Sequence, residues 1–153
     1  MKNSKMQVAL NEALLAKNEG EVPVGAAIFL GDTLIASAHN ETVKTKQADA
    51  HAELLAIRKA TEILGDWRLS ECELYVTLEP CAMCCGAILL SKIKRIYFGA
   101  YDSQSGVCGG KIDITGENLF GSQPEIYGGI YELECQRLLS DFFSNLRNEK
   151  NKN

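Results

Sequence analysis

The chain has 153 residues, of which 46% are hydrophobic and 24% are charged, and this composition excludes a disordered protein. A chain of this length can bury about two thirds of its unfolded surface as one unit, so we expect a single domain over residues 1–153. The formal net charge of −4 argues against broad, non-specific adhesion to nucleic acid, because phosphate binding rests on excess Lys and Arg.

The first twenty residues carry polar or charged groups every few positions. They contain no continuous apolar run for a signal peptide or a membrane span, so we expect a cytoplasmic protein with no membrane partner. The six cysteines would then lie in a reducing compartment, which disfavours disulfides. Three of them cluster at positions 81, 84 and 85, and such crowding is more typical of metal or redox chemistry than of structural bridging.

An N-terminal helix is predicted by apolar residues at three- and four-residue spacing, and Gly20 is placed to end it. These apolar residues are Met6, Leu10, Ala13, Leu14 and Ala16. Two β-compatible runs, 24–30 and 33–38, flank a glycine-containing turn and predict a hairpin. Helical spacing returns over residues 49–64, where Asp49 is the expected N-cap. The buried stripe of this helix is expected to comprise Leu54, Leu55, Ile57 and Ile63.

The middle of the chain predicts a strand, a helix and a second strand. Residues 73–79 have the composition of a strand, and Pro80 marks a break after it. Residues 81–91 have helical composition, and residues 94–100 form the next predicted strand.

A glycine-rich stretch over residues 106–129 is predicted to be mainly loop, with a short strand-like run at residues 125–127. The last predicted helix carries its apolar residues at i, i+3, i+4 and i+7, and residues 148–153 are expected to fray. Those apolar residues are Leu139, Phe142, Phe143 and Leu146. Strands that alternate with helices favour an α/β fold, a three-layer α/β/α sandwich around a central mixed sheet.

Two short motifs carry the chemistry, and each begins a predicted helix. One is the pair His51 and Glu53, and the other is the pair Cys81 and Cys84 after Pro80. Cysteines three apart lie within one helical turn, and amides at a helix N-terminus stabilise the thiolates that bind metal. One imidazole and two thiolates fill three positions of a tetrahedral zinc and leave the fourth for water, as in catalytic sites. We therefore expect one Zn²⁺ per chain.

Glu53 is the candidate proton carrier, because hydrolysis of an amine also needs a group that moves protons onto the substrate. Two residues beyond His51 on a regular helix, its side chain would point elsewhere. We therefore expect the zinc to lie beyond the N-terminus of this helix, within reach of both side chains.

The other candidate ligands are expected to pack instead. Cys85 adjoins Cys84 but turns about 100° away around the helix, so it is interpreted as a small buried side chain. His39 ends a hairpin strand, where an exposed or packed role is favoured over ligation. The isolated cysteines, which most often simply pack, are Cys72, Cys108 and Cys135.

The paired motifs, H-x-E and P-C-x-x-C, resemble those of the cytidine-deaminase-like superfamily. Within it, the segments EVPVGA, HNET, HAELLAI, LYVTLEPCAMCCGAI, FGAYDSQSGVCGG and ECQRLLSDFF look like the bacterial tRNA adenosine deaminases, from about residue 5 to residue 147. The resemblance implies a zinc hydrolase that converts adenosine to inosine at the wobble position of a tRNA anticodon. It also implies a cytidine-deaminase-like fold, a tRNA anticodon stem-loop as partner and a homodimer.

The resemblance also implies roles for residues around the substrate. Asn40 would hydrogen-bond the nucleoside, Asp102 would contact the backbone of the flipped nucleotide, and Pro23 and Val24 would line the pocket. Many members of this family read GARD followed by a lysine, where residues 99–104 here read GAYDSQ. Two basic side chains are therefore missing.

Two alternatives stay open at this point. The first keeps the chemistry but acts on a free base or nucleoside such as guanine or cytosine, in line with the acidic balance and the missing basic residues. The second is a zinc-stabilised binding module without catalysis, in which Glu53 is an ordinary helix residue. A purely structural zinc site has no use for a carboxylate that does not ligate, which weighs against this second alternative.

Overall fold

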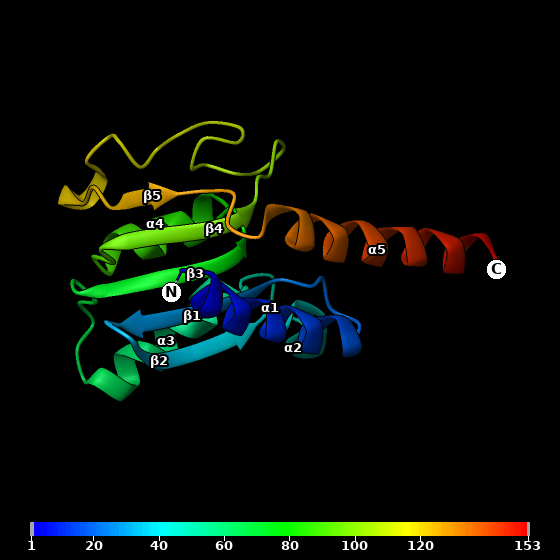
Figure 1. Ribbon diagram of the computed structural model, residues 1–153, viewed down its shortest axis with the longest axis horizontal. Helices are drawn as coiled ribbons and strands as arrows, with labels where there is room; N and C mark the ends of the chain where they lie inside the picture. The colour runs from blue at the N-terminus through cyan, green and yellow to red at the C-terminus, as the bar shows by residue number, and fades with distance from the viewer. Residues whose placement is uncertain (1, 153) are drawn as a thin grey trace.

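The computed structural model describes residues 2–152, in which five strands form one sheet in the order β2-β1-β3-β4-β5 (Figure 1). The strands are β1 (Gly25–Leu30), β2 (Thr33–His39), β3 (Cys72–Leu78), β4 (Arg95–Ala100) and β5 (Glu125–Tyr127). Strand β1 is antiparallel to both β2 and β3, whereas β4 is parallel to both β3 and β5. The expected mixed sheet is confirmed.

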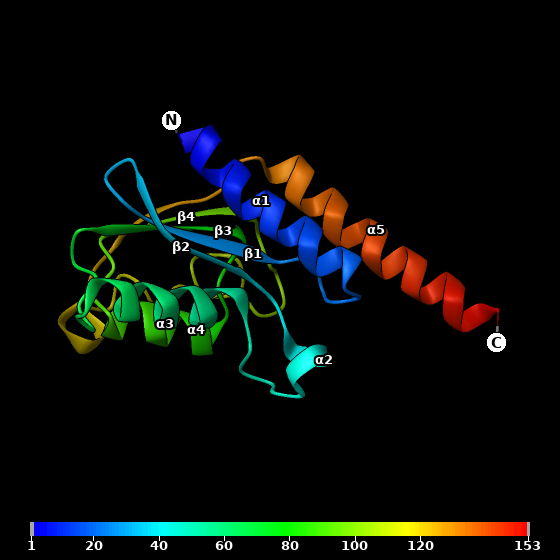
Figure 2. The same ribbon diagram turned by 90° about the horizontal axis from the view of Figure 1, so that it is seen from below.

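Helices cover both faces of the sheet, with α1 and α5 on one face and α3 and α4 on the other (Figure 2). The helices are α1 (Lys2–Asn18), α2 (Thr42–Thr45), α3 (Ala52–Leu64), α4 (Ala82–Leu90) and α5 (Glu132–Asn151), with a 3₁₀ turn η1 (Leu119–Gly121). Buried apolar side chains fill a separate layer on each face of the sheet. The three-layer α/β/α architecture is therefore confirmed. Over residues 2–152, no helix is both long enough and apolar enough to cross a membrane.

Helix α1 lies directly on β1, and Gly25 makes this approach possible. A Cβ atom at Gly25 would meet the Ala9 carbonyl oxygen at 2.0 Å, closer than any side chain tolerates. Of the five apolar residues expected in the buried stripe of α1, Leu14 is 44% exposed and the other four are buried. Gly20 follows the helix with a positive φ of 80°, a conformation that suits the expected helix end.

Helix α3 begins later than expected, at Ala52, so the N-cap is His51 and not Asp49. The carboxylate of Asp49 instead lies 3.6 Å from Arg58. Of the expected stripe only Ile57 is buried, whereas Leu54 and Leu55 are half-buried and Ile63 is exposed, because the buried face continues through small residues. The buried residues of α3 are Ala52, Glu53, Ala56, Ile57 and Ala60. A carboxylate thus lies on the buried face of this helix.

Helix α5 extends past the edge of the sheet, as Figure 1 shows in orange and red. Cys135 is buried and Leu139 packs against both core layers, but Phe143 and Leu146 are exposed. Phe142 is half-buried and contacts Phe143 edge to face. The helix continues to Asn151, beyond the expected point of fraying, with Lys150 in its last turn.

His39 connects the end of β2 to α1 and to the residue that follows α1. Its Nδ1 lies 2.6 Å from a carboxylate oxygen of Glu12, and its Nε2 lies 3.0 Å from one of Glu19. Burial by itself lowers the pKa of His39, but the hydrogen bonds to Glu12 and Glu19 outweigh it and raise the pKa above its usual value. His39 is therefore a packed residue apart from the zinc candidates, as expected.

The raised pKa of His39 makes its contribution to stability depend on pH. The stabilisation is complete below the unfolded-state pKa of about 6.5 and is lost as pH rises through the folded-state pKa. We expect His39→Gln to lower the free energy of unfolding by about 1 kcal/mol at pH 6 and by less at pH 9. Urea denaturation of both proteins at the two pH values measures this, and equal losses would contradict it.

Candidate active site

One edge of the sheet brings together residues that are far apart in the sequence. The carboxyl ends of the parallel strands β3 and β4 lie at this edge, where ligands bind in open α/β sheets. Because β1 is antiparallel to β3, the beginning of β1 and the end of β2 lie at the same edge. Four residues adjoin these strand ends or lie within two residues of them, namely Val24, Asn40, Pro80 and Asp102.

Three candidate metal ligands converge at this edge. His51 and Cys81 are the N-cap residues of α3 and α4, both with extended backbone, and Cys84 lies in the first turn of α4. The Nδ1 atom of His51 is 3.7 Å from Sγ of Cys81 and 3.4 Å from Sγ of Cys84. One donor atom from each residue lies within 4.8 Å of the others, and no other such group occurs in residues 2–152.

The chemistry of this donor set fits zinc. Hydrogen bonds with Cys84 and His51 lower the pKa of Cys81 to about 4, so that Cys81 is a thiolate at neutral pH. Two sulfur donors and one imidazole match the ligands of catalytic zinc, which keeps an open fourth position. Cys85 is fully buried and interacts with Cys108, so it packs as expected.

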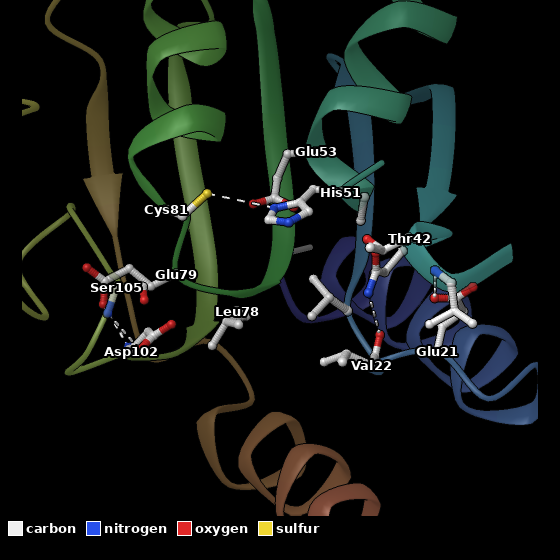
Figure 3. Close-up of a pocket in the computed structure, with 14 residues that line it drawn as sticks. Glu21, Val22, Thr42, His51, Glu53, Leu78, Glu79, Cys81, Asp102 and Ser105 are labelled. Carbon is white, nitrogen blue, oxygen red and sulfur yellow. Dashed lines mark hydrogen bonds between the residues drawn. The ribbon is translucent and has the colours of Figure 1, made fainter. Parts of the chain in front are cut away.

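Glu53 faces the same site from the first turn of α3. Figure 3 shows His51 and Glu53 projecting toward Cys81, and all three line one cavity. The Glu53 side chain is only 4% exposed, and its Oε1 atom has no hydrogen-bond partner within the described part of the chain. Burial raises the pKa of Glu53. A buried oxygen without a partner is costly, so this carboxylate is placed for a ligand or a reacting group.

The cavity has a volume of about 410 Å³ and mixes apolar with polar walls, as small-molecule sites do. Val24, Asn40 and Asp102 line it, in agreement with where the sequence prediction placed them. Pro23 does not line the cavity, which corrects that expectation, and Val22 does. The chain turns at Pro23, because the backbone N–H of Val24 donates to the carbonyl of Val22 at 2.8 Å.

Asn40 ends β2 in a turn and also faces the cavity. Its Oδ1 atom accepts hydrogen bonds from the backbone N–H and the hydroxyl of Thr42, at 3.2 and 2.6 Å. Its Nδ2 atom donates to the Val22 carbonyl over a long 3.5 Å. These contacts fix the orientation of the amide, so that Nδ2 can donate its second hydrogen to a ligand.

Two buried glutamates at the cavity were not predicted. Glu21, 1% exposed, accepts the backbone N–H groups of Val43 and Lys44 at 3.0 and 2.8 Å. Glu79, 2% exposed, accepts backbone N–H groups from the loop that follows β4. The only signal in the sequence is an acidic residue close to a proline at a strand end, which is too general to identify either residue.

Comparison with known proteins agrees with this geometry. Residues 1–100 match the cytidine and deoxycytidylate deaminase zinc-binding region. The chain is 43% identical over 145 residues to the tRNA-specific adenosine deaminase of Bacillus subtilis, an alignment covering 95% of this chain and 90% of that protein.

Solved structures share the fold. One, from a study of A-to-I editing by tRNA:A34 deaminases at the wobble position of transfer RNA, is 39% identical with a TM-score of 0.80, covering 89% of this chain and 99% of the other. The guanine deaminase of Nitrosomonas europaea is 25% identical with a TM-score of 0.80, covering 92% and 83%. The chain therefore belongs to the zinc-dependent cytidine and deoxycytidylate deaminase family.

Proposed function

We propose that the protein is a zinc-dependent hydrolase that deaminates adenosine to inosine at the wobble position of a tRNA anticodon. The observation that carries this proposal is the buried carboxylate of Glu53, whose Oε1 atom has no hydrogen-bond partner in the described residues, in one cavity with His51 and Cys81. The substrate follows from the likeness to the tRNA-specific adenosine deaminase of Bacillus subtilis, which extends over 95% of the chain.

His51, Cys81 and Cys84 would hold the zinc, which when bound supplies an acidified water as the nucleophile. Glu53 accepts a proton from the attacking water and delivers it to N1 of the adenine as C6 is attacked. It then transfers the second proton to the departing amine, so that adenosine and water give inosine and ammonia. The burial of Glu53 suits this role, because it raises the pKa of the carboxylate and so favours its acceptance of a proton.

The cavity walls would hold the extruded nucleoside. Val24 supplies an apolar contact for the base, and the Nδ2 atom of Asn40 supplies a hydrogen-bond donor. Asp102 lies at the opposite wall, where it would contact the backbone of the flipped nucleotide. An anticodon loop suits this site because its bases are single-stranded and can be extruded at low cost.

The alternatives are less well supported. A free-base substrate such as guanine is favoured by the acidic balance, by the missing basic side chains and by the likeness to guanine deaminases. One of these, from Bacillus subtilis, is 36% identical over 64% of this chain, whereas the tRNA:A34 deaminase structure is 39% identical over 89% of it. A non-catalytic zinc module would bury a carboxylate with one oxygen, Oε1 of Glu53, left without a partner in the described residues, and this energetic cost would serve no purpose.

We also propose that the enzyme is a cytoplasmic homodimer that pairs through α4. Met83 and Leu90 are 41% and 52% exposed, and they flank the small residues Gly86 and Ala87 at i, i+3, i+4 and i+7. Such an exposed apolar stripe on one helix face is typical of an interface. A tRNA substrate and six free cysteines are both in keeping with the cytoplasm.

The metal assignment makes a prediction that separates adjacent cysteines. We expect about one zinc per wild-type chain, and loss of both zinc and activity in Cys81→Ala and in Cys84→Ala, because each removes one of three ligands. The matched control is Cys85→Ala, which should keep both. Metal analysis of the purified proteins provides the measurement, and a Cys85→Ala protein without zinc would show that the ligand set is wrong.

The function is tested with an anticodon stem-loop carrying a wobble adenosine, alongside free adenosine, guanine and cytosine. We expect inosine in the stem-loop as the main product of the wild type, identified by mass spectrometry. Glu53→Gln should keep zinc and fold but lose at least about 10²-fold in rate, because the amide preserves size without accepting a proton. Guanine as the main substrate would establish the alternative, and near-normal turnover by Glu53→Gln would refute the mechanism.

The proposed dimer has its own test in light scattering. We expect a molar mass twice that of one chain for the wild type. Leu90→Glu should give a monomer, because it introduces a charge into an apolar interface. Leu146→Glu, a charge on the exposed part of α5, serves as the control and should leave the dimer intact. A monomeric wild type would refute the proposal.

A further inference from the structure

Glu79 is a buried carboxylate whose two oxygens bind three backbone N–H groups of one loop. Its Oε1 atom accepts from Asp102 at 2.9 Å, and its Oε2 atom accepts from Cys108 and Gly110, both at 2.8 Å. The side chain is 2% exposed and therefore withdrawn from water. Hydrogen bonds to an ionised acceptor are stronger than those between neutral groups, so Glu79 is a firm anchor for the loop.

The loop is shaped to enclose this carboxylate. A Cβ atom at Gly106 would lie 2.4 Å from Oε1 of Glu79, and one at Gly110 would lie 2.1 Å from the same atom. The backbone N–H of Val107 also bonds the carbonyl of Pro80, next to Glu79. Residues 101–118 form no helix or strand, and Val107 and Cys108 of this loop are buried in the core. Glu79 therefore holds the loop together with these core contacts, and its hydrogen bond to the Asp102 N–H is the contact nearest the cavity wall.

The anchored loop supplies one wall of the cavity. Asp102 and Ser105 both line the cavity, and Figure 3 shows them with Glu79 on the side opposite Glu21. The Oδ1 atom of Asp102 accepts the backbone N–H groups of Gln104 and Ser105 at 3.0 and 3.1 Å. Its Oδ2 atom has no hydrogen-bond partner in residues 2–152, which leaves it available to a ligand.

We propose that Glu79 is a positioning residue for substrate binding, which holds Asp102 at the cavity by charge-assisted hydrogen bonds to the loop backbone. This inference rests on the proposed function, because it takes the nucleotide in the cavity as the group that Asp102 meets. Glu53 and the three candidate metal ligands lie outside the loop that Glu79 anchors. Because Glu79 is only two residues before Cys81, zinc content and kcat are the readouts that separate a role in binding from one in the chemical step.

Replacement by glutamine is a sharp test, because it preserves shape but halves the number of acceptor oxygens. The single oxygen of the amide can serve either Asp102 or the pair Cys108 and Gly110, and its NH₂ group then faces a donor on the other side. An unsatisfied buried donor costs more than the hydrogen bond it lost.

The experiment compares Glu79→Gln with the control Glu117→Gln, an exposed residue with the same change of charge. Wild-type deamination of the anticodon stem-loop is established first, since its failure would refute the proposed function and not this inference. We then expect KM for the stem-loop to rise about tenfold in Glu79→Gln, with kcat within about threefold and zinc unchanged. Glu117→Gln should match the wild type.

A double-mutant cycle then tests whether Glu79 acts through Asp102. If it does, Glu79→Gln should raise KM much less in an Asp102→Ala background than in the wild type, because the residue it positions is already gone. Gly110→Ala disturbs the same contact from the loop side, should Glu79→Gln fail to fold, and should also raise KM. The proposal would be overturned if the effects of Glu79→Gln and Asp102→Ala on KM were additive. It would also be overturned by an unchanged KM in both Glu79→Gln and Gly110→Ala, or by loss of zinc.

Discussion

The structure depends on two helix N-termini meeting at one point. Helices α3 and α4 begin within reach of each other, and their N-cap residues His51 and Cys81 point into the gap between them. Each helix start carries a partial positive charge, so their approach is unfavourable by itself. The thiolate of Cys81 offsets this repulsion, and a metal-bound pair of thiolates would offset it further. The negative charge at the site therefore offsets the repulsion between the two helix N-termini that form it.

The same convergence explains why a carboxylate is buried on α3. Glu53 follows His51 by two residues, which directs its side chain to the face that otherwise carries small apolar residues such as Ala56 and Ala60. A nonpolar residue there would remove a buried oxygen that has no partner in the described part of the chain. Stability is thus given up at the position that chemistry requires, as happens at many active sites.

The sequence predicts the residues that act through their own side-chain chemistry much better than those that act through geometry. His51, Cys81 and Cys84 are identified by ligand type and spacing, and the helices and strands that carry them follow from apolar periodicity. The order of the strands does not follow, because β1 pairs with β3 some 40 residues later, through contacts that local patterns do not encode. The N-cap was misplaced at Asp49 because an acidic residue before a helical pattern is the usual signal, whereas here the metal ligand occupies that position.

Glu21 and Glu79 show a second limit of prediction. Their partners are backbone N–H groups 22 to 31 residues away. Every residue except proline carries the same backbone N–H group, so the sequence does not show which of them will be the partner. Pro23 and Val22 show a third, because which of two neighbours faces a cavity depends on the turn that the Val24 N–H makes with the Val22 carbonyl, and propensity does not fix that turn. Each of these errors concerns orientation, and none concerns the type of element.

The residues that select the substrate must lie in the walls of the cavity and not among the candidate metal ligands. A tRNA:A34 deaminase structure and a guanine deaminase match this chain with the same TM-score of 0.80, so a common scaffold serves both an RNA and a free base. In this chain one wall is fixed by Glu21 and the other by Glu79, each through backbone N–H groups. Such anchors leave the loop side chains free to vary while the loop backbone keeps its place. Such an arrangement would let the substrate change through wall residues such as Asp102, without any change at the carboxylate anchors or at the candidate zinc ligands.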